Sequence, residues 1–146
     1  MEIQVIVAGK PAIAYARDGI AFFEQRLKPL GKVSIRYVKA GSSEDVSARL
    51  MEASAGCLRI VLDERGQSWK TREFEKHLRH WQLHSVKKVA FLIGAADGHT
   101  EALRQAADIK LCLGAHTMQH ELALLVLMEQ IYRVHTILAG SPYHRD

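Results

Sequence analysis

The chain has 146 residues, of which 48% are hydrophobic and 25% are charged. This length is typical of one domain, and this apolar content is sufficient for a core and too high for a disordered chain. We therefore predict a single domain over residues 1–146. Twenty Lys and Arg against sixteen Asp and Glu give a formal net charge of +4, which by itself identifies no binding partner.

Neither a membrane protein nor a secreted protein is favoured. No apolar run approaches the roughly 18 to 20 residues that a membrane helix needs. The first residues, Met1–Val5, lack the basic region and the long apolar stretch of a signal peptide. Cys57 and Cys112 lie in apolar surroundings without metal-ligand spacing, which favours buried free thiols in a reducing compartment. The cytoplasm is the expected location.

Short apolar strands alternate with helices along the whole chain. In chain order we predict strand Glu2–Gly9, helix Ala12–Leu30, strand Val33–Val38, helix Ser43–Ala55, strand Cys57–Leu62, helix Thr71–His84, strand Val89–Ile93, helix Glu101–Ala107, strand Ile109–Leu113 and helix His120–Ala139. The predicted loops and the tail that matter below are Asp63–Ser68, Gly94–Gly98, Gly114–Gln119 and Gly140–Asp146.

This alternation predicts an α/β fold with a parallel sheet and helices on both of its faces. Sheets of this kind bind ligands in the loops beyond the carboxyl ends of their strands. The loops that follow Leu62, Ile93 and Leu113 are therefore the candidate binding loops.

The last predicted helix is apolar on all sides over two turns, because Leu122–Met128 is a run of seven apolar residues. A helix on one side of a sheet in a monomer keeps a polar face. Either the domain encloses this helix or a partner molecule covers it. The small size of the domain favours the second interpretation, a homodimer formed through the helix of residues 120–139.

Positive charge is concentrated in one stretch of the chain. Seven Lys and Arg lie between Arg65 and Ala90, where the only acidic residues are Glu73 and Glu75. Two interpretations remain open, namely an ordinary solvated helix face and a surface that binds a polyanion.

Common cofactor signatures are absent from the sequence, which has no P-loop and no glycine fingerprint in the first strand–helix turn. His116 and His120 are four residues apart, but the loop before His120 disfavours a continuous helix, so we predict no metal site. The loop Gly94–Gly98 is typical either of a tight turn or of backbone that approaches a ligand closely. The tail residues Tyr143–Arg145 suit either a frayed chain end or a site that stacks on a base and contacts phosphate.

Four segments together resemble one known family. They are GAADG at Gly94–Gly98, TMQH at Thr117–His120, EQIYR at Glu129–Arg133 and PYHR at Pro142–Arg145. In length and in the order of these segments, the chain resembles the ribosomal large-subunit pseudouridine N3-methyltransferases of the SPOUT superfamily. The resemblance covers essentially the whole chain, and its most specific part is the combination of the EQIYR run with the tail.

The resemblance implies an α/β fold whose carboxyl-terminal part is tied into a deep trefoil knot, an exception to the usual unthreaded topology. It implies a homodimer that binds S-adenosylmethionine in the knot and needs no metal. The implied reaction is methylation of N3 of a pseudouridine in large-subunit rRNA within the assembled ribosome. It also implies that the tail of one subunit completes the methyl-donor pocket of the other.

The resemblance further implies roles for particular residues. Those implied in binding the methyl donor, largely through backbone groups, are Leu62, Gly94, Ala95, Gly114, Ala115, His116, Thr117, Met118 and Gln119. Those implied in substrate binding or catalysis are His120, Tyr143 and Arg145. Since the N3 atom must lose a proton, a base with a pKa near neutrality assists, and His120 and His144 are the candidates. Arg145 is better suited to hold phosphate or a base carbonyl.

Three positions depart from the family pattern. Ala95 stands in place of a second glycine, and its methyl group is expected to narrow the donor pocket. Gln119 stands in place of a proline, which is expected to free the backbone of this loop. Leu124 stands in place of a basic residue, and the loss of charge is expected to weaken a contact with RNA or with the partner subunit.

Three other functions remain open from the sequence. The chain could methylate a different RNA nucleotide on the same scaffold. It could be a non-catalytic protein that binds RNA or the ribosome without a methyl donor. It could also be a flavodoxin-like binder of a small molecule, although the phosphate-binding turn of that class is not found in the sequence.

Overall fold

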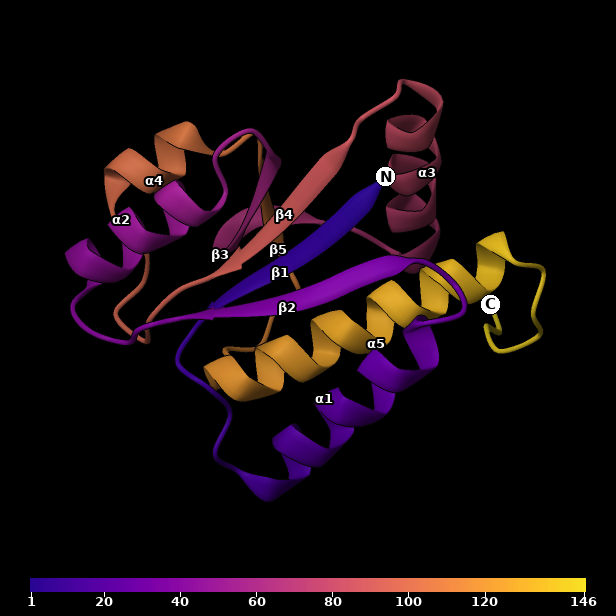
Figure 1. Ribbon diagram of the computed structural model, residues 1–146, viewed down its shortest axis with the longest axis horizontal. Coiled ribbons are helices and arrows are strands. Elements are labelled where there is room, and N and C mark those ends of the chain that lie inside the picture. The colour runs from indigo at the N-terminus through magenta and orange to yellow at the C-terminus, as the bar shows by residue number, and fades with distance from the viewer.

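The computed structural model describes residues 1–146 and contains five strands that alternate with five helices (Figure 1). In chain order the elements are β1 (Glu2–Ala8), α1 (Ala14–Leu27), β2 (Lys32–Val38), α2 (Ser43–Ala53), β3 (Leu58–Ser68), α3 (Thr71–Leu83), β4 (Lys88–Ile93), α4 (Glu101–Ala106), β5 (Ile109–Cys112) and α5 (His120–Leu138). No helix of the structure is both long and apolar enough to cross a membrane.

The five strands form one parallel sheet in the order β2-β1-β4-β3-β5. Helices α1, α3 and α5 cover one face, and α2 and α4 cover the other (Figure 1). Because side chains alternate along each strand, Ile3, Val5 and Val7 of β1 join the core under α1, α3 and α5, whereas Ile6 and Ala8 join the core under α2 and α4. The predicted parallel sheet with helices on both faces is confirmed.

Strand β3 is longer than the sequence predicts, because the predicted loop Asp63–Ser68 belongs to it. Leu62 and Gln67 both pair with Leu111 of β5, so the four residues between them form an irregularity in the strand. Gly66 lies against the backbone of β5 here, since a Cβ atom built on it would approach the carbonyl group of Lys110 to 2.5 Å. This segment lies past the residues of β3 that pair with β4, and its polar composition gives no sign of the pairing with β5.

Helix boundaries otherwise differ from the predictions by up to three residues. The largest difference is in helix α1, which the sequence predicts over Ala12–Leu30 and which begins at Ala14 and ends at Leu27. Helix α2 begins at the predicted residue, but its capping residue is Ser42, whose hydroxyl accepts a hydrogen bond from the Asp45 N–H at 3.1 Å.

Helix α5 is embedded more deeply than a helix that merely lies on a sheet. Its inner side is in the core, and none of its residues from His120 to Leu138 is exposed. Its outward side carries Leu122, Val126, Glu129 and Arg133, one or two turns apart, and all four are half-buried. The neighbouring helix α1 explains part of this burial, because the Leu125 side chain packs against Gly19.

Candidate active site

The carboxyl ends of β3, β4 and β5 surround a cavity of about 630 Å³, which we call the carboxyl-end pocket. Three segments supply most of its lining, namely Leu62–Arg65 of β3, Gly94–His99 after β4, and Gly114 with His116–Gln119 after β5. They are the three segments that the sequence analysis selected as loops, although the structure places the first of them within β3. They meet because parallel strands bring their carboxyl ends to the same edge of a sheet.

All of the residues predicted to bind the methyl donor line this pocket, except Ala115. His120, in the first turn of α5, lines it as well. No group of three or more metal-ligating side chains occurs in the structure. Charged side chains of both signs also line the pocket, namely Asp63, Glu64 and Asp97 together with Arg65 and Arg104.

The tail packs at the opposite end of α5, beside α3 (Figure 1). The Tyr143 hydroxyl donates a hydrogen bond to Glu129 at 3.1 Å, and the guanidinium of Arg133 lies 4.8 Å from the centre of the Tyr143 ring. The His144 ring lies between Arg133, at 3.2 Å, and Asp146, at 3.0 Å. These contacts hold the tail against the last turns of the helix that it follows.

Within one chain, the predicted catalytic residues therefore form two separate groups. His120 lies in the first turn of α5, whereas Tyr143 and His144 contact Glu129 and Arg133, which are about 14–20 Å further along the helix at about 1.5 Å per residue. Arg145 is exposed and makes no hydrogen bond or ion pair in the structure. The pKa of Tyr143 is raised by burial and by the neighbouring Glu129, so this phenol stays protonated near neutral pH and acts as a hydrogen-bond donor.

His99 is a pocket residue that the sequence analysis did not identify. Its Nε2 atom lies 2.8 Å from the carbonyl oxygen of Leu62 and donates to it, which leaves Nδ1 buried without a partner. Burial lowers the pKa of His99, and this outweighs the opposing effects of the Leu62 carbonyl and Asp63, so the ring is neutral. The ring lies directly against Gly94, where a Cβ atom would come within 2.7 Å of it.

A buried ion pair reinforces the same junction. The Asp63 side chain is only 6% exposed, and its Oδ2 atom lies 3.0 Å from Nε of Arg104 in α4. Its Oδ1 atom accepts a hydrogen bond from the backbone N–H of Arg65 at 3.0 Å. Together, His99 and Arg104 attach the segment after β4 to the carboxyl end of β3, and they thereby set the distance between two walls of the pocket.

The departures from the family pattern at positions 119 and 124 have other consequences than those expected. Gln119 caps α5, because its side-chain oxygen accepts hydrogen bonds from the N–H groups of Glu121, at 3.0 Å, and Leu122, at 3.1 Å. The Glu121 carboxylate in turn accepts hydrogen bonds from the backbone N–H groups that precede α1. The loop is thus fixed rather than freed. Leu124 is 1% exposed in the core, so this position does not face RNA or a partner.

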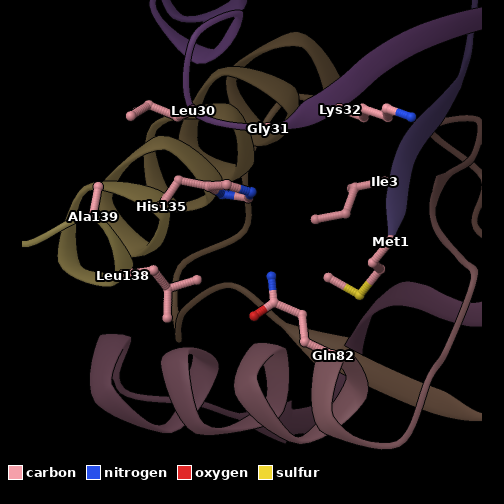
Figure 2. A pocket seen from close by; sticks show the side chains of 9 residues that line it. All are labelled: Met1, Ile3, Leu30, Gly31, Lys32, Gln82, His135, Leu138 and Ala139. Atoms are coloured by element: carbon pink, nitrogen blue, oxygen red, sulfur yellow. The ribbon is translucent and has the colours of Figure 1, made fainter.

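A second, smaller cavity of about 210 Å³ lies at the amino ends of β1 and β2 (Figure 2). The imidazole of His135 and the carboxamide of Gln82 point into it, among the apolar side chains of Ile3 and Leu138 (Figure 2). His135 Nδ1 lies 2.8 Å from the carbonyl oxygen of Ile131 and donates to it. Burial lowers the pKa of His135 and outweighs the effect of this hydrogen bond, so the ring is neutral at pH 7.

The contact between Gly94 and His99 generates a first prediction. We expect Gly94→Ala to displace the His99 ring from the Leu62 carbonyl and to lower the free energy of unfolding by about 1–3 kcal/mol, as measured by urea denaturation. In the double variant with His99→Ala, the added methyl group has room. The double variant is therefore expected to lose less free energy of unfolding than the two single variants lose together. Simple additivity of the two effects would contradict this assignment.

The buried neutral His135 generates a prediction on pH. In the unfolded chain its pKa returns to its ordinary value of about 6.5, so below that pH the unfolded state binds a proton that the folded state does not. We therefore expect the stability to be constant above pH 6.5 and to fall below it, by at most about 1.4 kcal/mol per pH unit for this group. Urea denaturation at pH 7.5 and 5.5 measures the fall.

The matched variants for this pH experiment are His135→Gln and His116→Gln, since His116 is exposed. The first is expected to reduce the pH dependence, with a part remaining because burial also lowers the pKa of His99, and the second is expected to leave it unchanged. An equal slope in His135→Gln and in the unsubstituted protein would show that His135 is not the group responsible.

Comparison with known proteins agrees with this geometry. The family described as predicted SPOUT methyltransferase matches residues 1–144. The chain is 43% identical to the ribosomal RNA large subunit methyltransferase H of Thermus thermophilus over 145 residues, which are 99% of each chain. It is 39% identical to the protein of the same name from Deinococcus radiodurans, again over 99% of each chain.

Among solved structures, the tRNA (m1G37) methyltransferase from Aquifex aeolicus shares the fold. Its TM-score is 0.56 at 12% identity, over 100% of this chain and 76% of that one. The match over nearly the full length, the relatives above 30% identity and the common fold lead to one conclusion. The chain belongs to the SPOUT methyltransferase family.

Proposed function

We propose that this protein transfers the methyl group of S-adenosylmethionine to N3 of a pseudouridine in large-subunit rRNA, on the assembled ribosome. The observation that carries the proposal is the carboxyl-end pocket, where the residues implied in donor binding come together with His120. The names of the relatives supply the substrate class, since they are ribosomal RNA large subunit methyltransferases. The expected cytoplasmic location is consistent with this substrate.

The pocket suits the proposed methyl donor in size and chemistry. Its volume of about 630 Å³ lies within the roughly 300–1,000 Å³ of typical ligand pockets. Gly94, Gly98 and Gly114 lie along its wall, and the carboxylates of Glu64 and Asp97 line it as well. S-adenosylmethionine supplies an activated methyl group on a cationic sulfur, which explains why the reaction needs no metal. The knotted path of the carboxyl-terminal part stays a prediction from the family.

In the proposed reaction, the chain mainly positions the reacting groups. His120 lies at the pocket because it is in the first turn of α5. Gln119 caps this turn, and Glu121 binds the backbone just before α1, so the position of the turn is fixed. Rigid placement of nucleophile, methyl group and sulfur in line is a large source of rate enhancement. A histidine at the pocket accepts the N3 proton as the second contribution, and His120 and His144 are the candidates.

The proposed active site needs two copies of the chain. The tail is held against Glu129 and Arg133 of its own α5, about 14–20 Å along the helix from His120, so we propose that the tail that completes a pocket comes from a second copy. The outward side of α5 presents the half-buried Leu122 and Val126. The neighbouring helix α1 exposes Tyr15 and Phe22, and the residue before it, Ile13, is exposed as well. We propose this α5–α1 surface as the homodimer interface.

The reaction itself is tested with labelled S-adenosylmethionine, intact ribosomes and free rRNA, followed by nucleoside analysis. We expect labelled N3-methylpseudouridine from ribosomes and much less from free rRNA. Replacing both candidate bases, in His120→Ala/His144→Ala, is expected to lower kcat about 10²-fold or more, while calorimetry shows the donor still bound. Label in a different nucleoside would favour another RNA substrate. Failure to bind the donor at millimolar concentration would favour a non-catalytic RNA-binding protein.

The proposed interface is tested with Val126→Arg, which places a charge in the apolar surface of α5, and with Val126→Ala as the mild control. We expect Val126→Arg to be monomeric by light scattering and inactive, and Val126→Ala to be dimeric and active. Mixing an inactive Arg145→Ala protein with an inactive Gly94→Ala protein is expected to restore part of the activity, because one of the two sites in a mixed dimer is intact. A monomer with full activity would refute the shared site.

A further inference from the structure

The outward side of α3 carries a row of positive charge. Arg72, Lys76 and Arg79 are four and three residues apart, so they lie on the same side of the helix, and all three are exposed. Past the end of the helix, Lys87 and Lys88 are exposed as well. We call the row of Arg72, Lys76 and Arg79 the α3 cationic face. It is the structural form of the basic stretch that the sequence analysis left with two interpretations.

The acidic residues of this helix cancel only part of the charge of the row, since Glu73 is exposed on the same helix and Glu75 pairs with two of the three cations. Glu75 lies beneath it, with a side chain that is 12% exposed, and binds Arg72 and Arg79 at 3.0 Å each. Burial acts to raise the pKa of Glu75, but the hydrogen bonds from Arg72 and Arg79 outweigh it and lower the pKa, so the carboxylate is ionised. It fixes the two guanidinium groups at the surface, and Lys76 between them has no ion-pair partner.

The row is displayed on a rigid support. The inner side of α3 inserts Phe74, Leu78 and Trp81 into the core. Trp69 stacks on His77 with ring centres 4.0 Å apart, which holds the amino-terminal half of the helix. Leu83, at the last turn, is the only exposed large apolar side chain of this helix. A membrane surface would favour apolar side chains interspersed among the cations, so the composition of this face favours a soluble polyanion.

The tail shows what Arg72 can bind. Asp146 occupies the fork of this guanidinium with both carboxylate oxygens, at 2.9 Å from Nε and 2.8 Å from Nη2. A second hydrogen bond joins α3 to α5, since the Thr71 hydroxyl donates to Gln130 at 2.8 Å. A fork that accepts two carboxylate oxygens has the same geometry that binds two phosphate oxygens. The tail and the α3 cationic face therefore lie side by side, as Figure 1 shows for the two segments.

We propose that the α3 cationic face binds the phosphate backbone of the RNA next to the nucleotide that is methylated. This inference rests on the proposed function and extends it. If the tail of one subunit completes the pocket of its partner, then α3 of the same subunit lies beside that partner's pocket. The RNA strand that enters the pocket then passes along α3, where the cations of this row contact its phosphates and hold the strand in register.

The test compares ribosome binding and donor binding of the intact dimer. The main variant is Lys76→Gln/Arg79→Gln, in which Arg72 still binds Glu75. If this double variant is unstable, Lys76→Gln alone replaces it, because that substitution leaves the ion pairs of Glu75 intact. The control is Arg36→Gln, which removes an exposed cation from β2 on the face of the sheet that carries α2 and α4, because Arg36 is in register with Ile6. Lys76→Arg serves as the charge-retaining variant.

We expect the double variant to raise the Kd for ribosomes about tenfold and to reduce the slope of log K against log salt by about 2, because two phosphates are no longer neutralised. The Kd for S-adenosylmethionine is expected to stay unchanged in every variant, and Lys76→Arg and Arg36→Gln are expected to bind ribosomes normally. If the unsubstituted protein methylates ribosomes and the double variant binds them with the same Kd and salt slope, the α3 proposal is wrong while the proposed function stands. If the unsubstituted protein does not methylate or bind ribosomes, the proposed function fails, and this proposal fails with it.

Discussion

The point on which the rest of the site depends is Leu62–Asp63 of β3, where the strand pairing becomes irregular. His99 donates to the carbonyl of Leu62, and Arg104 binds the buried carboxylate of Asp63, so two residues that follow β4 are attached to the adjacent strand. Removing one partner of such a buried pair leaves the other without compensation, which is costly in free energy. The pocket walls are therefore kept apart by fixed contacts, and a methyl donor would enter a site that is already formed.

Helix α5 imposes the second constraint. Its first turn faces the carboxyl-end pocket, its inner side builds the core, and its last turns hold the tail. The tail is held against Glu129 and Arg133 of this helix, about 14–20 Å from His120, so the residues proposed for the reaction lie in two groups within one chain. This geometry is the physical reason for proposing a dimer, in agreement with the half-buried Val126 of α5 and the exposed Phe22 of α1. It also connects α3 to the same site, because Arg72 binds Asp146 of the tail.

The order and kind of the elements could be predicted because the signals are local. Apolar strands, glycine-rich turns and the spacing of apolar residues on helices all act over a few residues, and the three loops that form the pocket follow from parallel topology. The site was predicted less completely. His99 and Arg104 carry no local signal, since each is a single polar residue near a short helix whose partner lies about forty positions away in the chain. The extension of β3 was missed for the same reason, since the polar segment Asp63–Ser68 pairs only because β5 lies beside it.

The sequence by itself determined the α/β class, the candidate binding loops, the apolar carboxyl-terminal helix and the concentration of basic residues before β4. These depend on composition and short-range periodicity, which a linear chain contains in full. Only the tertiary structure decided that Gln119 caps α5, that Leu124 is in the core and that the tail lies away from its own pocket. It also decided that Glu75 is buried beneath two arginines and leaves the positive charge outside. Such facts depend on which distant segments meet, because burial and the partners of a charge are fixed by packing rather than by the order of residues.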